Sequence, residues 1–494
     1  MKIFTIPTET GKYAIPLLIF ITFFSRLPQL LSPNLYMDGD ECIVGLMAKH
    51  FMEGKELPLF FYGQSYGFSF LEVLPISMFY ALMGISILAV KLAMLLLFTI
   101  GIVFFYKALA RIGNRNTHWG AFLVTLLLVF SPTYAIWSMK ARGGYLTAFM
   151  LTSVVMFLLF APKEKQSIAP SIVTGLLLLI IYEAQPLWLA GLIPLLIYRD
   201  FQIKSFRSAL WRIIGLVLGI GVFSFLKRGL THFWIPPKIG FSSIHFEWVK
   251  NIPENVFLAF TGSYDYTEYI EPELITQLLS SITSYSIPVV FLIGIGVMVI
   301  NRKLNGLFLV SSVSVLFSLG YLVVVDGSNP RYIIPLLGYV LLMIYSVAVM
   351  LKNNKFIPVA FTIVILMGAV SLYRFKDHVY YDNVSEQQLV QLMEAHDVEY
   401  LFSKGGLLQW KLMFYTEEEV VARYVTNTDR YPEYVEKVNQ AYQQSDTNIA
   451  LVGYYDEALV QSSDQFIPVN KSFYFYNNPP KELLLKLGFQ LSEE

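Results

Sequence analysis

Apolar runs, separated by shorter polar segments, repeat along the chain from residue 13 to residue 373. A helix that crosses the hydrocarbon core of a bilayer needs about 20 residues. The runs give eleven candidate spans, at 13–32, 87–107, 119–137, 146–162, 168–183, 185–198, 211–230, 280–300, 305–325, 332–351 and 355–373. The pattern therefore predicts an all-α polytopic membrane domain with about eleven transmembrane helices.

Some runs depart from the simple pattern. The first, 13–32, has no small-residue cleavage site behind it, so we interpret it as a retained helix rather than a signal peptide. The runs 168–183 and 185–198 are short, and we expect them to be bent or half-buried. The run 71–84 contains Pro75 and has only about 14 residues, which favours a re-entrant or interfacial helix.

The distribution of basic residues orients the helices. Short loops rich in Lys and Arg stay in the cytoplasm. If 71–84 does not span, every basic cluster falls on one side together with the N-terminus: Lys107, Arg111, Arg115, Lys163, Lys165, Arg199, Lys204, Arg207, Arg212, Arg302, Lys303, Lys352 and Lys355. We therefore expect a cytoplasmic N-terminus and an extracytoplasmic C-terminus.

The last quarter of the chain has a different pattern. Residues 376–494 are charged and rich in tyrosine, and they contain no spanning run. A helix leading into a strand is predicted for 385–403, and another strand for 447–455. We divide the chain into a transmembrane domain, 1–375, with a long first outer loop at 33–86, and a small extracytoplasmic α/β domain, 376–494.

Composition agrees with a membrane protein and narrows its partners. Hydrophobic residues make up 55% of the 494 positions and charged residues only 15%, whereas soluble proteins carry about a quarter. The net charge of zero gives no indication of a nucleic-acid partner. No Walker-type glycine-rich motif and no Cys/His zinc spacing occurs, so the sequence gives no indication of a nucleotide or zinc site of these types.

Three acids stand close together directly after the first apolar run. Asp38, Asp40 and Glu41 precede a segment with helical apolar spacing. The pair Asp38 and Glu41 matches a capping box, which would explain these two residues by local structure alone. Asp40 is left without that explanation, although an acid in a first helical turn is common.

A functional interpretation of the same acids follows from their place at the outer membrane surface. Partial desolvation there raises the proton affinity of a carboxylate, which suits a general base. Asp40 and Glu41 together could also hold a divalent cation such as Mg²⁺ or Mn²⁺ through oxygen ligands. The sequence leaves both options open.

Several motifs on the expected outer face resemble one known family. They are the Asp40-Glu41 pair followed by Lys49, His50 and Gly54, then FFYGQSYGFSFLE at 60–72, WSMKARGGYLTAF at 137–149 and NPRYIIPL at 329–336. In this order they resemble membrane glycosyltransferases of the GT-C superfamily, and more narrowly the bacterial protein mannosyltransferase/aminoarabinose transferase-like branch. The resemblance covers about 33–375 well and the tail loosely.

The resemblance implies a multi-pass enzyme of the bacterial plasma membrane that takes a sugar from a polyprenyl-phosphate donor. The acceptor would be a glycan, a lipid or a protein at the outer face. Asp40 is the expected base, with Glu41 and Asp38 beside it. Charge grows on the departing phosphate, and an arginine offers a planar fork that matches phosphate oxygens. Arg142 and Arg331 are the candidates for that role.

Further residues are weaker candidates for contacts with substrate, and each has an ordinary structural alternative. His50 could be a cation at a helix C-terminus, and Glu72 an acid in a first turn. Glu183 lies between the two short runs and could pair with an arginine. Tyr145 and Tyr332 could stack on sugar or prenyl groups or belong to an interfacial aromatic belt.

Two other classes of function remain open. Charges near spans also mark the translocation paths of transporters and lipid flippases, but these charges gather on one side and no paired halves are visible. A polysaccharide polymerase or ligase would work at the same place with a diphosphate-linked donor. Membrane lipid is a partner in every case.

Overall fold

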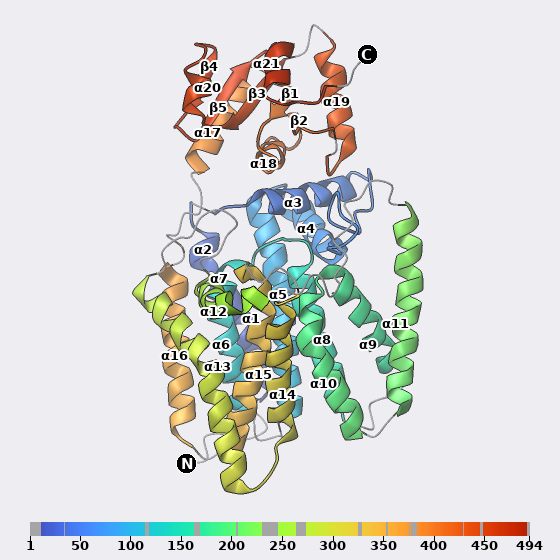
Figure 1. The fold of residues 1–494 in the computed structure, drawn as a ribbon, viewed down its shortest axis with the longest axis vertical. Helices are drawn as coiled ribbons and strands as arrows, with labels where there is room; N and C mark the ends of the chain where they lie inside the picture. Colours follow the sequence, from blue (N-terminus) through green and yellow to red (C-terminus); the bar gives the residue numbers. More distant parts are fainter. Residues whose placement is uncertain are drawn as a thin grey trace.

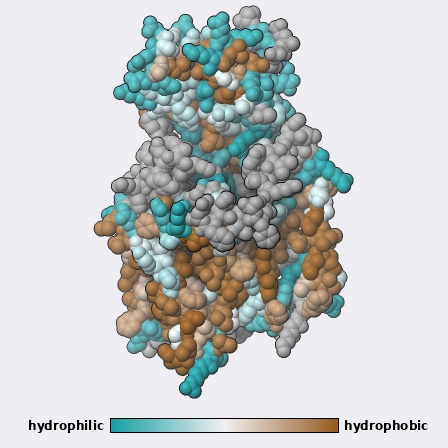
Figure 2. All heavy atoms as spheres, viewed as in Figure 1, coloured by the Kyte–Doolittle hydropathy of each residue, from teal (hydrophilic) through white to brown (hydrophobic). Residues whose placement is uncertain are grey.

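The fold is described from a computed structural model that covers residues 11–33, 35–113, 118–162, 168–203, 206–229, 246–262, 273–324, 329–351, 354–374, 376, 383–427, 429–444 and 448–491. A bundle of long helices forms one end of the molecule, and a small α/β domain forms the other (Figure 1). The surface of the bundle is mainly apolar, whereas that of the α/β domain is mainly polar (Figure 2). The predicted fold class is confirmed.

Each of the eleven predicted spans contains a helix. The helices are α1 (Gly11–Phe24), α2 (Leu27–Leu30), α5 (Ile87–Ile112), α6 (His118–Val129), α7 (Thr133–Trp137), α8 (Tyr145–Leu159), α9 (Ile168–Ala184), α10 (Leu187–Ile203), α11 (Phe206–Leu226), α13 (Leu274–Asn301), α14 (Gly306–Tyr321), α15 (Ile334–Met350), which follows the 3₁₀ turn η5 (Pro330–Ile333), and α16 (Phe356–Arg374). Six segments of the described chain are long and apolar enough to cross a membrane on their own: Tyr13–Leu30, Ile87–Ile112, Phe206–Leu226, Leu274–Asn301, Pro330–Met350 and Phe356–Arg374.

Two of the predicted spans are broken rather than continuous. The first divides into α1 and α2 just before Pro28, and the third divides into α6 and α7 next to Pro132. Proline lacks the N–H that a continuing helix needs. The buried Arg26 joins the two breaks, because its guanidinium donates to the carbonyl of Val129 at 2.8 Å and to that of Tyr134 at 3.0 Å.

The first outer loop contains two helices, α3 (Gly39–Met52) and α4 (Phe70–Met83). The predicted helix at 71–84 is thus present. Each has 14 residues, about 21 Å at 1.5 Å per residue, which is shorter than a bilayer core of about 30 Å. Helix α3 lies across the end of the bundle, beneath the α/β domain (Figure 1).

Residues 231–275, between the predicted spans 211–230 and 280–300, lie partly outside the described residues. Their described part holds the 3₁₀ turn η4 (Phe246–Asn251) and helix α12 (Ile252–Thr261). The carbonyl of Ala259 in α12 accepts a hydrogen bond from Thr133 of α7 at 2.9 Å. This loop therefore packs against the broken end of the third span.

The C-terminal domain is a five-stranded mixed sheet with the strand order β2-β1-β3-β5-β4. Its elements are α17 (Asn383–Ala395), β1 (Tyr400–Ser403), α18 (Leu408–Tyr415), β2 (Val421–Arg423), α19 (Pro432–Tyr442), β3 (Ile449–Tyr454), α20 (Glu457–Val460), β4 (Phe466–Val469), β5 (Phe473–Asn477) and α21 (Lys481–Lys486). Strand β1 is parallel to β2 and β3, whereas β5 is antiparallel to β3 and β4. The predicted helix and both predicted strands are confirmed.

The two faces of this sheet belong to different cores. Successive side chains of a strand point to opposite faces. Leu401 and Val452 belong to the large core that continues into the helical bundle, whereas Phe402 and Leu451 belong to a separate core under α19 and α21. One face of the sheet is therefore packed toward the membrane domain, which fixes the position of the loops at its edge.

Candidate functional site

The capping box predicted for the acidic cluster is present. Asp38 is the N-cap of α3, and its Oδ1 accepts a hydrogen bond from the Glu41 N–H at 2.9 Å. The Glu41 carboxylate in turn accepts from the Asp38 N–H at 3.1 Å. Two of the three acids thus have a role in starting α3, and Asp40 is the one whose carboxylate is not used by the cap.

Each of the three carboxylates nevertheless meets a cation from a distant part of the chain. Lys91 of α5 places its Nζ 2.6 Å from Glu41. Lys140 lies 2.8 Å from Asp38. Arg142 bridges two acids, because one guanidinium nitrogen is 3.1 Å from Asp38 and the other is 2.9 Å from Asp40.

A further cation comes from the C-terminal domain. Nη2 of Arg430 lies 3.9 Å from Asp40, on the opposite oxygen from Arg142. The side chain of Asp40 is 13% exposed, compared with 9% for Asp38 and 2% for Glu41. Asp40 is therefore the most accessible acid of the cluster and lies between two arginines.

Burial and charge act differently on the two capping acids. Burial raises the pKa of the Asp38 carboxyl, but the charges of Lys140 and Arg142 outweigh that effect and hold its pKa well below the usual range. For Glu41, burial is the largest influence and raises the pKa, and the opposing charge of Lys91 only partly offsets it. Asp38 is thus a permanent anion that anchors Arg142.

The turn that carries Arg142 is held by two buried acids of the first loop. Glu41 accepts a hydrogen bond from the Ala141 N–H at 3.2 Å, and Glu72 accepts from the Gly144 N–H at 3.0 Å. Gly144 has a φ of +91°, and a Cβ there would lie 2.8 Å from the backbone of Ala184. The glycine permits both the turn and its close approach to the end of α9.

Arg331 also lies near this turn. It belongs to η5, directly before α15. Its Nη2 donates to the Tyr332 hydroxyl at 3.1 Å, and its guanidinium lies 5.0 Å from the centre of that ring. The charges of Arg331 and Arg142 both act on the hydroxyl of Tyr145. Asp40 and Arg142 are thus in direct contact. Arg331 lies in their vicinity, because its charge and that of Arg142 both act on Tyr145.

Glu183 has a structural partner. Its carboxylate is 2.5 Å from Lys227 at the end of α11, a lysine where the sequence suggested an arginine. Its backbone carbonyl accepts hydrogen bonds from Gly67 at 2.8 Å and from Phe68 at 3.0 Å. Glu183 therefore ties the first outer loop to the end of α9.

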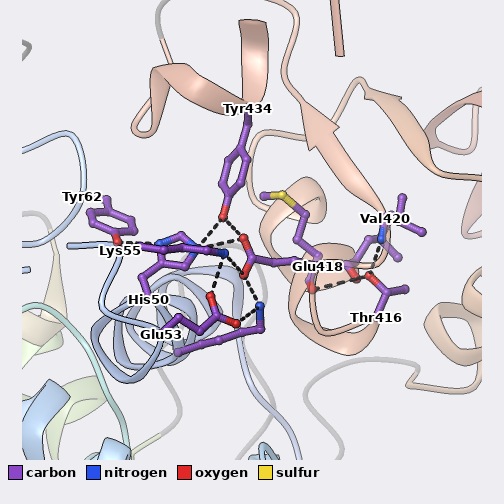
Figure 3. A network of polar contacts seen from close by, with 11 residues as sticks. His50, Glu53, Lys55, Tyr62, Thr416, Glu418, Val420 and Tyr434 are labelled. Atoms are coloured by element: carbon purple, nitrogen blue, oxygen red, sulfur yellow. Dashed lines mark hydrogen bonds and ion pairs between the residues drawn. The ribbon is translucent and has the colours of Figure 1, made fainter. Parts of the chain in front are cut away.

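His50 does not join this group. It lies ten residues beyond Asp40 on α3, about 15 Å along the helix. Its Nε2 is 2.8 Å from Glu418 and its Nδ1 is 2.8 Å from the Tyr62 hydroxyl, and the residue is 1% exposed. Nε2 thus contacts the C-terminal domain, whereas Nδ1 contacts the loop that follows α3 (Figure 3).

Sequence reasoning missed several residues of this site. Lys91 had a usable signal, because a charged residue within an apolar helix is costly and usually paired. Lys140 stands two positions before Arg142 in a motif already singled out. Tyr66, on whose hydroxyl the charges of Arg430, Arg331 and Asp40 act, stands in the 60–72 motif already singled out. Arg430 gave no local signal.

The carboxylates do not fit a metal ion. Across the described ranges of the chain, no group of three or more His, Cys, Asp or Glu side chains is arranged to hold one. Glu41 is engaged by Lys91 and by the cap, while Asp40 is engaged by Arg142. These cations already engage one oxygen of Asp40 and one of Glu41 that a Mg²⁺ or Mn²⁺ ion would need, so no step through a metal is derived.

Comparison with known proteins identifies a solved structure with the same fold. No protein-family model matches the sequence, and neither does a curated protein. Two solved structures of ArnT from Cupriavidus metallidurans match 96% of this chain and 99% of their own, at 12% sequence identity. The TM-score is 0.61 for the structure bound to undecaprenyl phosphate and 0.60 for the apo state. The chain has the fold of ArnT.

The match to ArnT includes the C-terminal domain as well as the bundle, because it covers nearly the whole of both chains. The shared fold and the many apolar helices agree with the prediction of a multi-pass membrane protein.

Proposed function

We propose that the protein is a membrane glycosyltransferase that takes a sugar from a polyprenyl-phosphate-linked donor. The observation that carries the proposal is Asp40, a partly accessible carboxylate held between Arg142 and Arg430. Asp40 is in the first turn of α3. This helix lies between the helical bundle and the C-terminal domain (Figure 1). The ArnT fold supports the same conclusion, since one ArnT structure is bound to undecaprenyl phosphate.

The proposed reaction assigns one role to the Asp40 carboxylate and another to the two arginines. An acceptor hydroxyl attacks the anomeric carbon of the donor sugar while Asp40 removes its proton. The bond between that carbon and the phosphate oxygen breaks, and its electron pair leaves with the polyprenyl phosphate. Arg142 and Arg331 stabilise the charge that grows on the phosphate, and the hydrogen bonds of the 141–144 turn keep Arg142 in position.

The reaction is assigned to the extracytoplasmic side of a bacterial plasma membrane. The basic loops between the spans support that side, because such loops stay in the cytoplasm. The N-terminus is then cytoplasmic, and the acidic cluster and the C-terminal domain are outside. The acceptor is a glycan, a lipid or a protein that presents a hydroxyl there.

Transfer in liposomes tests the proposal. The purified protein is reconstituted with undecaprenyl phosphates that carry radiolabelled pentoses or hexoses, together with an extract of envelope lipids and glycans as acceptor. We expect a labelled product with the wild type and a loss of about 10²- to 10⁴-fold for Asp40→Asn. Asp464→Asn removes an exposed acid from the C-terminal domain and should leave transfer unchanged.

Other outcomes point to other functions. Movement of label across the bilayer without a covalent product would assign the protein to the transporters or flippases. Release of a lipid diphosphate would assign it to the polymerases or ligases. Full transfer by Asp40→Asn would remove Asp40 as the base.

A further inference from the structure

The C-terminal domain has a defined position on the membrane domain. Helix α18 packs closely on α3: a Cβ at Gly39 would lie 2.6 Å from Leu407, and one at Gly45 would lie 2.6 Å from Phe414. Glu418 adds an ion pair with Lys49 at 2.6 Å. It also makes a hydrogen bond with His50 at 2.8 Å (Figure 3). The loops of this domain therefore meet the acidic cluster in a fixed geometry.

Arg430 is the residue that this docking brings to the cluster. It stands just before α19, and its guanidinium lies 5.1 Å from the centre of the Phe61 ring. Gly63 makes the approach possible, because a Cβ there would lie 2.8 Å from the Arg430 Cα. Two residues of one segment, Phe61 and Gly63, thus shape the place where this arginine lies.

The guanidinium of Arg430 has unused hydrogen-bonding capacity. Its 3.9 Å separation from Asp40 is an ion-pair distance but too long for a hydrogen bond. Its Nη1 is buried and meets no hydrogen-bond acceptor within the described part of the chain. A buried donor without a partner is energetically costly, and a bound acceptor would recover that cost.

The charges around Arg430 favour an anion as that acceptor. Asp38 and Asp40 carry two negative charges, whereas Lys140, Arg142 and Arg430 carry three positive ones. Glu41 is matched by Lys91. The charges of Arg430 and Arg331 both act on Tyr66, which places a second arginine in the same neighbourhood and increases the positive excess.

We propose that Arg430 is a substrate-binding residue supplied by the C-terminal domain, and that it binds the phosphate of the polyprenyl-phosphate lipid together with Arg331. This inference rests on the proposed function and extends it. The α/β domain completes the binding site for the donor in addition to covering it. Because arginine offers a fork of parallel donors to phosphate, lysine at this position would keep the charge but lose the geometry.

Binding of undecaprenyl phosphate to the detergent-solubilised full chain tests the inference independently of turnover. Arg430→Gln should weaken binding by about tenfold or more, which is the effect of losing a hydrogen bond between charged groups. Arg430→Lys should recover part of the loss. Lys437→Gln, which removes an exposed charge from α19, is the matched control and should bind like the wild type.

Two comparisons separate the possible failures. Undecaprenol has the same chain without phosphate, and its binding should not distinguish wild type from Arg430→Gln. The thermal midpoint of Arg430→Gln should equal that of the wild type, which shows that the domain remains docked. Equal affinity of wild type and Arg430→Gln for undecaprenyl phosphate would overturn the role of Arg430, whereas failure of the wild type to prefer undecaprenyl phosphate over undecaprenol would overturn the proposed function itself.

Discussion

Glu418 of the C-terminal domain and His50 of α3 are joined across the domain boundary by a contact of 2.8 Å between Oε1 and Nε2. The Tyr434 hydroxyl donates to the same carboxylate at 2.5 Å, and Lys49 lies 2.6 Å from its other oxygen. The network shown in Figure 3 thus concentrates donors on one acid that is only 8% exposed. It is a clamp between the domains rather than a site of chemistry.

We expect the stability of this contact between the domains to depend on pH through the carboxyl of Glu418. Burial raises the pKa of Glu418, but the hydrogen bonds from His50, Lys49 and Tyr434 outweigh that effect and hold its pKa well below the usual range. A carboxyl with a depressed pKa stabilises the fold fully above its unfolded pKa of about 4.3, and that contribution is lost as the pH falls toward the folded value.

We therefore expect Glu418→Gln to lose about 1.5–3 kcal/mol of stability near neutral pH. The difference in thermal midpoint between wild type and variant should narrow as the pH falls below about 4. Hydrogen exchange in the second half of α3 should rise in the variant. Glu419→Gln, an exposed acid next to it, is the control and should show neither change. A difference that is independent of pH would contradict the clamp.

The sequence was most informative about structural features that depend only on residues close together in the chain. The apolar runs were identified by their length, because a helix that crosses a bilayer needs about 20 residues. Every predicted span contains a helix. The spacing of Asp38 and Glu41 is itself the definition of a capping box, and that box is present. Asp40 and Arg142 were both expected on one face of the membrane, but the ion pair between them was not predicted.

The remainder of the site depends on contacts between distant segments. Arg430 approaches Asp40 from the far end of the chain, and nothing around it in the sequence indicates that approach. His50 was expected among the substrate contacts, but Glu418, 368 residues away, engages it instead. No local pattern determines how a separate domain docks on a helix, so these two residues could not be assigned from the sequence.

The turn that carries Arg142 should be sensitive to a single added methyl group. Gly144→Ala imposes both a φ of +91° and a contact of 2.8 Å with the backbone of Ala184. Backbone strain of this kind costs about 1–3 kcal/mol, and the displaced turn would carry Arg142 away from Asp40. We expect a lower thermal midpoint and a loss of sugar transfer of at least tenfold.

Gly84→Ala is a matched control for that experiment. Gly84 has a φ of +82°, but a Cβ there would meet no atom within 4 Å among the described residues. It should show the backbone strain without the displaced turn, and so retain transfer. If the two variants lose transfer equally, the crowding at Ala184 is not what positions Arg142.

The buried pair of Lys91 and Glu41 should behave as a unit. Removing one partner of a buried ion pair costs about 3–5 kcal/mol, because the other charge stays buried without compensation. Lys91→Met should therefore destabilise the protein strongly, and the double variant with Glu41→Gln should recover much of the loss. Lys107→Met is the control on the same helix, since the described residues offer Lys107 no ion pair. Additive effects of the two single variants would exclude the coupling.

Glu72 should make stability fall as the pH rises. Burial raises the pKa of its carboxyl to about 8, against the opposing hydrogen bond from the Gly144 N–H. Between the unfolded value of about 4.3 and the folded value, the folded state holds a proton that the unfolded state has lost. The free energy of unfolding therefore decreases with pH across that window and levels off above it.

Glu72→Gln keeps the acceptor for the Gly144 N–H and does not titrate. Its stability relative to the wild type should thus increase between about pH 5 and pH 8, by at most about 1.4 kcal/mol per pH unit. Thermal midpoints measured across that range check the trend, with Glu254→Gln, an exposed first-turn acid of α12, as the control. Parallel pH profiles for wild type and Glu72→Gln would mean that Glu72 is ionised in the folded protein, and the hydrogen bond to Gly144 would then involve a buried anion.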